Sequence, residues 1–203
     1  MDLYRVIEKR RSVRAFMPDE IEFDKIANII EAARHAPSAG NLQAWKFIVI
    51  WEEKTRHAIA ELCVRQEWIA QAPVLIVVCA ELEAEKEFYG QRGELYALQS
   101  AAAATEHLLL AATKEGLGSC WVGAFQEGQV SRLLEIPDKA RPTAIIALGY
   151  HEGGVAPMVK KKVEDITFFH KWGNRTSDLI AKKHEYYKYL EKILQKGKAL
   201  LSK

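Results

Sequence analysis

The chain has 203 residues, of which 49% are hydrophobic and 28% charged, and its formal net charge is +2 at pH 7. These values fit a globular protein and exclude an intrinsically disordered, collagen-like or disulfide-stapled chain. A net charge so near zero favours no polyanionic partner for the whole chain, although residues 151–203 carry +6 and residues 1–150 carry −4. We expect the basic segment to be a solvated tail, with binding of an anion such as a phosphate as the alternative.

The cysteines indicate a reducing compartment. Cys63, Cys79 and Cys120 lie among apolar residues and form no C-x-x-C pair, so neither a disulfide framework nor a zinc site is expected. The first residues lack the apolar core of a signal peptide. No apolar run approaches the roughly 20 residues that span a bilayer. We therefore expect a cytoplasmic protein that does not bind membranes.

Hydrophobic periodicity predicts alternating helices and strands. The predicted helices cover about 26–36, 53–66, 94–115, 126–134 and 177–196, and the predicted strands cover 44–51, 73–80, 119–125 and 143–149. The strand at 73–80 is apolar throughout, which indicates that both of its faces are covered. The pattern favours an α/β or α+β fold in a single domain over residues 1–203. The last helix packs either on its own core or on a second subunit.

A basic cluster, Arg10-Arg11-Ser12-Val13-Arg14, lies near the N-terminus. In an extended segment Arg10, Ser12 and Arg14 point to one side. Two guanidinium groups flanking a hydroxyl suit a phosphate or the polar edge of a ring, because they bind planar oxygens through paired hydrogen bonds. The alternative is the basic C-terminal end of a helix, which the helix dipole favours.

Two loops have the composition of ligand-binding segments. The first, residues 36–45, joins a helix to a strand with short polar side chains and free backbone N–H groups, and is otherwise a plain turn. The second, residues 116–125, places small residues at Gly123 and Ala124, where a flat ligand could approach the main chain. The same sequence is equally compatible with a glycine-containing connection between the end of a helix and a strand. Trp121 and Phe125 either shape such a pocket or belong to the core.

Familiar catalytic and nucleotide-binding motifs are absent from the sequence. There is no G-x-G-x-x-G, no phosphate-binding P-loop, no paired histidines of a zinc protease and no G-x-S-x-G turn. Hydrolase and metal-enzyme functions therefore have little support, and no metal ligand is predicted.

In this order, the segments resemble the FMN-dependent nitroreductase family, particularly its short, single-domain members. The resemblance covers almost the whole chain and rests on residues 10–14, 36–41, 71–73, 110–112, 116–121 and 147–150. It implies an α+β fold with a central, mainly antiparallel sheet flanked by helices. It also implies an intertwined homodimer with two FMN sites at the interface.

The resemblance also implies which residues bind FMN. One subunit would supply Arg10, Ser12 and Arg14, with Arg11 beside them, and the other would supply Pro37, Ser38, Ala39 and Asn41. The main chain at Val122, Gly123 and Ala124 would reach the N5/O4 edge of the ring. Gln66 is expected near the polar edge of the flavin. The phosphate would meet a basic residue after the last core strand, for which Lys160, Lys161 and Arg175 are the candidates.

The chain departs from the family in three places. Many relatives have arginine in the late phosphate motif, where this chain has Lys160-Lys161-Lys162. Ser100 stands where short members often have an acidic residue. Gly123 stands where other relatives place an acidic side chain near the flavin, so the expected pocket is roomier and less negative. These departures bear on the preferred substrate more than on the cofactor.

The reaction implied is hydride transfer from NADH or NADPH to FMN, followed by reduction of an electron-poor acceptor such as a nitroaromatic or a quinone. Both substrates need the same flavin face, so ping-pong turnover is expected, and no protein nucleophile is required. Arg14 would stabilise the negative charge that hydride brings to the ring. Alternatives are reduction of activated alkenes, removal of a halogen, or flavin binding without catalysis. Nucleic-acid binding is disfavoured by the mixed charges of the C-terminal segment.

Overall fold

The computed structural model describes residues 1–64, 66–175 and 192. Its helices are α1 (Leu3–Lys9), α2 (Phe23–Arg34), α3 (Glu53–Leu62), α4 (Trp68–Gln71), α5 (Glu83–Tyr89), α6 (Gly93–Lys114), α7 (Glu127–Leu133) and α8 (Val163–Ile166). Its strands are β1 (Trp45–Ile50), β2 (Val74–Glu81), β3 (Gly118–Val122) and β4 (Ala140–Gly149). Short 3₁₀ turns cover Ala39–Asn41 and Gly90–Arg92.

The chain divides into two compact units, residues 1–155 and 156–203, which are described separately. The first unit contains the sheet and the helices α1 to α7, and the second contains α8. Apart from residue 192, the predicted C-terminal helix over about 177–196 lies outside the described residues. That helix and the assignment of residues 1–203 to a single domain stay predictions.

The four strands form one sheet in the order β1-β2-β4-β3, and every neighbouring pair is antiparallel. The α+β class and the antiparallel sheet implied by the family resemblance are therefore confirmed. A register shift between Val78 and Cys79 lies opposite Pro142 of β4. Proline lacks the N–H that a regular inner strand donates, and an irregularity of this kind lets an inner strand accept it.

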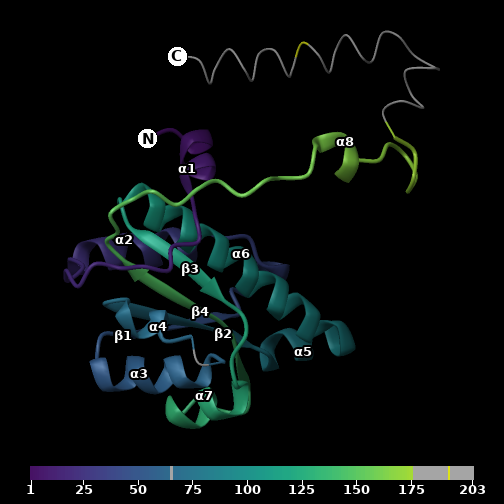
Figure 1. Cartoon of the computed structure of the whole chain (residues 1–203). Coiled ribbons are helices and arrows are strands. Elements are labelled where there is room, and N and C mark those ends of the chain that lie inside the picture. Colours follow the sequence, from purple (N-terminus) through teal and green to yellow (C-terminus); the bar gives the residue numbers. More distant parts are fainter. Residues whose placement is uncertain (65, 176–191, 193–203) are drawn as a thin grey trace. The chain divides into compact units, whose positions relative to one another are not determined.

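Helices cover both faces of the sheet (Figure 1). Ile76 and Val78 of β2 point to the side covered by α2 and α6, whereas Leu75 and Val77 point to the side covered by α3, α4 and α7. Residues 74 to 80 are all buried. This two-sided burial confirms the interpretation of the uninterrupted apolar run, since successive side chains of a strand alternate between faces.

The long helix α6 ends as the sequence predicts. Glu115 caps the helix, and Gly116 adopts φ +82°, a left-handed conformation that glycine takes without a steric penalty. The N–H of Leu117 donates to the carbonyl of Ala112 at 2.9 Å, so the last turn closes on itself. The chain then reverses into β3.

The structure differs from the sequence prediction at several boundaries. The helix expected over 53–66 ends at Leu62, because the chain turns at Cys63 and Val64 takes φ +57°. The strand expected over 119–125 ends at Val122. The helices α1, α4, α5 and α8 were not predicted as elements, although the basic C-terminal end of a helix was the alternative for residues 10–14.

Close packing of α5 on α6 generates a stability prediction at Gly93, the first residue of α6. A Cβ atom there would lie 2.2 Å from the carbonyl oxygen of Glu85. We expect Gly93→Ala to lower the free energy of unfolding by about 1–3 kcal/mol, because backbone must move to admit the methyl group. Urea denaturation measures the change.

Gly128 of α7 is the matched control, since a Cβ atom there has no neighbour within 4 Å. Gly128→Ala should be neutral or stabilise the protein by up to about 1 kcal/mol through helix propensity. Equal unfolding midpoints for Gly93→Ala and the unmodified protein would contradict the packing argument.

Candidate functional site

The basic segment Arg10–Arg14 lies beside the outer edge of β3. Arg10 caps α1, and the chain then extends so that Ser12 bridges to Ser119 in parallel orientation. The N–H of Val13 donates to the carbonyl of Ser119 at 2.9 Å. Val13 is buried, whereas Ser12 and Arg14 are exposed. Both alternatives are thus found in part: the segment begins at the C-terminal end of α1 and is then extended, with alternate residues on opposite sides.

Cys120 of β3 shows that Arg10, Ser12 and Arg14 lie together. Burial raises the pKa of its thiol, while the positive charges of Arg14 and Arg10 and a hydrogen bond with Ser12 act in the opposite direction. Groups that influence one thiol in this way lie close to it. The structure thus brings three of the predicted residues to one place on the edge of the sheet.

Arg14 reaches from this place towards α4. Its guanidinium carbon lies 5.8 Å from the centre of the Trp68 ring, an arrangement that favours a cation over an aromatic face. Gln66 lies two residues before Trp68 in the chain, and its side-chain amide donates to the carbonyl of Cys63 at 2.9 Å. Trp68 was not among the predicted site residues, because its contact with Arg14 joins segments more than 50 residues apart and leaves no local signal in the sequence.

The outer edge of β3 continues beyond Ser119 towards Gly123 and Ala124. Since Ser119 directs its carbonyl to Val13, strand alternation directs the main-chain groups of Trp121 to the same edge. In the described part of the chain, no backbone hydrogen bond joins the outer edge at residues 121–124. Gly123 and Ala124 are exposed, and Trp121 is 39% exposed. Val122 and Phe125 pack in the core under α3 and α7.

The loop before β1 is held in one shape. The N–H of Ala39 donates to the hydroxyl of Ser100 at 3.3 Å, and the N–H of Gln43 donates to the hydroxyl of Ser38 at 3.0 Å. Gly40 and Asn41 take φ values of +54° and +55°. The Tyr89 hydroxyl lies against Gly40, so a side chain there would collide with it. Ser100 and Tyr89 thus support the loop, a role that the sequence analysis did not predict.

Pro37 and Asn41 of this loop are exposed, whereas Ser38 and Ala39 are partly buried. The loop leads directly into β1, which is the edge strand opposite β3. Ser12 lies one strand further out, beyond β3. At roughly 4.8 Å per strand, these two predicted halves of the site are about 19 Å apart across the sheet. A single chain therefore does not bring Arg10, Ser12 and Arg14 together with the loop.

The late basic residues belong to the second unit. Lys160 and Lys161 are exposed. Arg175 is also exposed and forms an ion pair with Asp165 at 3.7 Å. The choice among these residues for a phosphate ligand stays a prediction.

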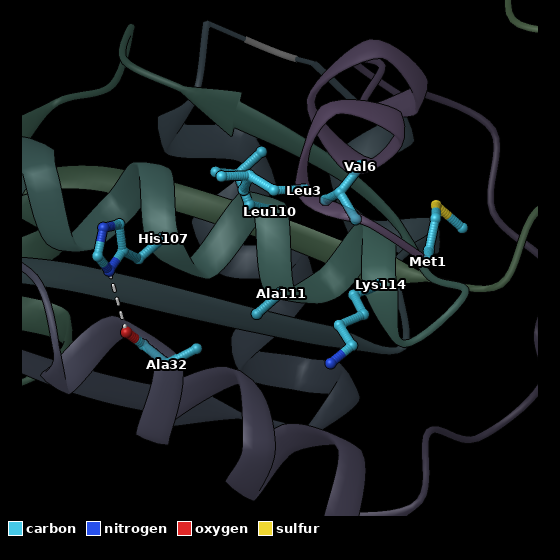
Figure 2. Close-up of a pocket in the computed structure, with 8 residues that line it drawn as sticks. All are labelled: Met1, Leu3, Val6, Ala32, His107, Leu110, Ala111 and Lys114. Atoms are coloured by element: carbon cyan, nitrogen blue, oxygen red, sulfur yellow. Dashed lines mark hydrogen bonds between the residues drawn. The ribbon is translucent and has the colours of Figure 1, made fainter. Parts of the chain in front are cut away.

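An apolar groove of about 380 Å³ lies apart from these residues, between α1, α2 and α6. Figure 2 shows Leu3 and Val6 of α1 on one side of α6 and Ala32 of α2 on the other. His107 of α6 lies 3.2 Å from the carbonyl oxygen of Ala32 and hydrogen-bonds to it, so this ring nitrogen is the donor. Outside the groove, α1 exposes further apolar side chains at Tyr4 and Ile7.

The described residues contain no group of three or more histidine, cysteine, aspartate or glutamate side chains placed to hold a metal ion. None of their helices combines the length and the hydropathy needed to cross a bilayer.

Comparison with known proteins gives a consistent family assignment. The sequence profile described as "Nitroreductase family" matches residues 7–66 and 54–150. A candidate NADH dehydrogenase/NAD(P)H nitroreductase of Archaeoglobus fulgidus is 34% identical over 150 residues, which are 72% of this chain and 83% of that protein. A crystal structure of a nitroreductase family protein from Clostridium novyi NT has 34% identity and a TM-score of 0.68, covering 88% of this chain and 98% of that one.

Two further relatives differ in the chemistry that their names state. The FMN reductase (NADPH) of Bacillus subtilis is 23% identical over 158 residues, 71% of this chain and 64% of that protein. The iodotyrosine deiodinase of Thermotoga neapolitana is 27% identical over 173 residues, 73% of this chain and 88% of that protein. The matched sequence profile and the relatives at 34% identity agree with the antiparallel sheet and the basic segment beside β3. The chain belongs to the nitroreductase family.

Proposed function

We propose that this protein is an FMN-dependent NAD(P)H oxidoreductase that reduces electron-poor acceptors. Membership of the nitroreductase family and the FMN and NAD(P)H named for its relatives support the enzyme class and the cofactors. The observation that carries the proposal is the face formed by the partly buried Arg10 and the exposed Ser12 and Arg14 next to the outer edge of β3.

The residues on this face fit FMN. Its phosphate carries close to two negative charges, which Arg10 can meet with charge-assisted hydrogen bonds, joined by Lys160 or Lys161. The outer edge at Trp121 and Gly123, which no described residue pairs with through the backbone, would offer main-chain groups to a polar ring edge. A Cβ atom on Gly123 would have only the Trp121 indole nitrogen as a neighbour, at 3.9 Å, so this backbone is open to close approach.

When bound, FMN would supply the hydride chemistry that links NADH or NADPH to the acceptor. The residues of this chain would position it. Arg14 would place a positive charge beside the ring, Gln66 would supply a polar side chain near it, and the backbone at 122–124 would offer groups to its reactive edge. The two substrates would use the same exposed surface in turn, which leads to ping-pong kinetics.

We further propose that each site is shared between two copies of the chain. The separation of about 19 Å between the two predicted halves supports this arrangement, since a partner's loop can cover the Arg14 face where its own loop cannot. Helix α1 exposes apolar side chains at Leu3 (63%), Tyr4 (64%) and Ile7 (50%). Contact with an apolar surface of a partner subunit would remove these side chains from water. The three free, buried thiols support a reducing, cytoplasmic setting.

The acceptor is the part of the function most open to alternatives. The deiodinase relative supports removal of a halogen as a second candidate, and the same scaffold suits activated alkenes. Rates on a nitroaromatic, a quinone, an enone and a halophenol, each measured with the same donor, rank these possibilities.

An anaerobic absorbance titration tests the enzyme function. We expect the visible flavin band of the FMN-loaded protein to disappear on addition of NADH or NADPH and to return on addition of a nitroaromatic or quinone. A yellow protein that neither donor bleaches would instead be a flavin-binding protein. A colourless protein that cannot be reconstituted with FMN would remove the proposal altogether.

Arg14 provides a test of the electrostatic role. Removing its charge in Arg14→Ala should lower the midpoint potential of bound FMN by about 30 mV or more, which is tenfold in the equilibrium of a two-electron couple. Arg14→Lys keeps the charge and is the matched control, with a potential close to that of the unmodified protein. Spectroelectrochemistry measures both variants, and an unchanged potential in Arg14→Ala would dismiss the role.

Subunit complementation tests the shared site. Arg10→Glu damages one predicted half, and Asn41→Gly removes a side chain from the other half while tolerating its positive φ. A doubly tagged heterodimer of these two variants has one intact site, so it should retain about half of the normal FMN content and activity. Heterodimers no better than the average of the two parental variants would mean that each chain builds its own site.

A further inference from the structure

A second pocket, of about 540 Å³, lies on the other side of the Arg10–Arg14 segment. It is formed by the end of α1, the end of α6, the start of β3 and the loop after β4. Its lining includes Lys9, Arg11, Val13, Leu117, His151 and Gly154. Neither Ser12 nor Arg14 lines it, because strand alternation turns Arg11 and Val13 away from them.

The ionisable residues that line this pocket within the described chain are Lys9, Arg11 and His151, with no carboxylate among them. The guanidinium of Arg11 donates through one nitrogen to the carbonyls of Glu8 and Arg10, the latter at 2.9 Å. These bonds hold the group at the end of α1. Its Nε is buried and has no hydrogen-bond partner among the described residues. A buried donor without an acceptor costs free energy, so the position calls for an acceptor.

The loop after β4 adds a further donor. The N–H of Gly153 donates to Nδ1 of His151 at 3.1 Å, so the ring hydrogen of the neutral imidazole is on Nε2. Gly153 and Gly154 take φ values of +89° and +79°, and a Cβ atom on either would meet nothing within 4 Å. The main chain is therefore open on this side. Val13 and Leu117 provide an apolar wall.

We propose that this pocket binds the phosphate group of a small organic phosphate, held by Arg11 and Lys9 with a hydrogen bond from His151. Cations with no competing carboxylate favour a multiply charged oxyanion. A volume of about 540 Å³ is that of a small-molecule site and leaves room for an apolar body against Val13 and Leu117. The site is separate from the face proposed for FMN, and it does not depend on that proposal.

Calorimetric titration of the FMN-loaded protein in phosphate-free buffer tests the site. The probes are inorganic phosphate, 5′-AMP and adenosine. We expect phosphate and 5′-AMP to bind with one site per chain, 5′-AMP more tightly because its body contacts the apolar wall, and adenosine not to bind measurably. Lys9→Gln and Arg11→Gln should each weaken 5′-AMP binding about tenfold.

Arg5→Gln is the control, because Arg5 of the same helix is exposed and pairs with Asp2. It should bind 5′-AMP as the unmodified protein does. Since Arg11 also holds the end of α1, Lys9→Gln and His151→Gln keep the test decisive if Arg11→Gln fails to fold.

Three results would overturn the proposal: no binding of phosphate or 5′-AMP, unchanged affinity in Lys9→Gln and His151→Gln, or binding that appears only after FMN is removed. The last would place the anion on the Arg10 face instead. The FMN content, read from visible absorbance in the same samples, reports separately on the proposed cofactor. A protein without FMN whose 5′-AMP affinity still falls in Lys9→Gln would refute the proposed function and uphold this pocket.

Discussion

One main-chain hydrogen bond, from the N–H of Val13 to the carbonyl of Ser119, sets the geometry on which both proposed sites depend. It adds the N-terminal segment to the edge of β3 and fixes its register there. In an extended segment a shift by one residue exchanges the two sides. The bond therefore decides that Arg10, Ser12 and Arg14 share a face with the free edge of β3, and that Arg11 points elsewhere.

The strand order determines whether the two predicted halves of the site can meet within one chain. The loop at residues 36–43 leads into β1, which is one edge of the sheet, whereas β3 is the opposite edge. No movement of a side chain spans the intervening strands, and the loop itself is held by Ser100 and Tyr89. A site that uses both segments is therefore a site between copies. Family resemblance suggested the same arrangement from the sequence alone, and the sheet topology supplies a physical reason for it.

The sequence predicted best what local patterns determine. The apolar run of β2 and the glycine after α6 indicated a doubly covered strand and a helix end, and both are present. Short elements were predicted less well. Helix α1 was missed although Asp2 caps it by accepting hydrogen bonds from the N–H groups of Tyr4 and Arg5, because a single capping residue is a weak signal in the sequence. The break at Val64 has no local cause in residue type, since a branched residue disfavours the positive φ found there.

Contacts between distant segments explain the rest. Extension of residues 10–14 depends on β3, more than 100 residues later in the chain, and support of the 36–43 loop depends on α5 and α6. Strand alternation separated Arg10 from Arg11 in the sequence only on the condition that the segment is extended, and the pairing with Ser119 is what meets that condition. Among the residues that the structure describes, none forms a backbone hydrogen bond with this edge beyond Ser119. The edge that binds the N-terminal segment at one end would therefore offer its main-chain groups to the proposed ligand at the other.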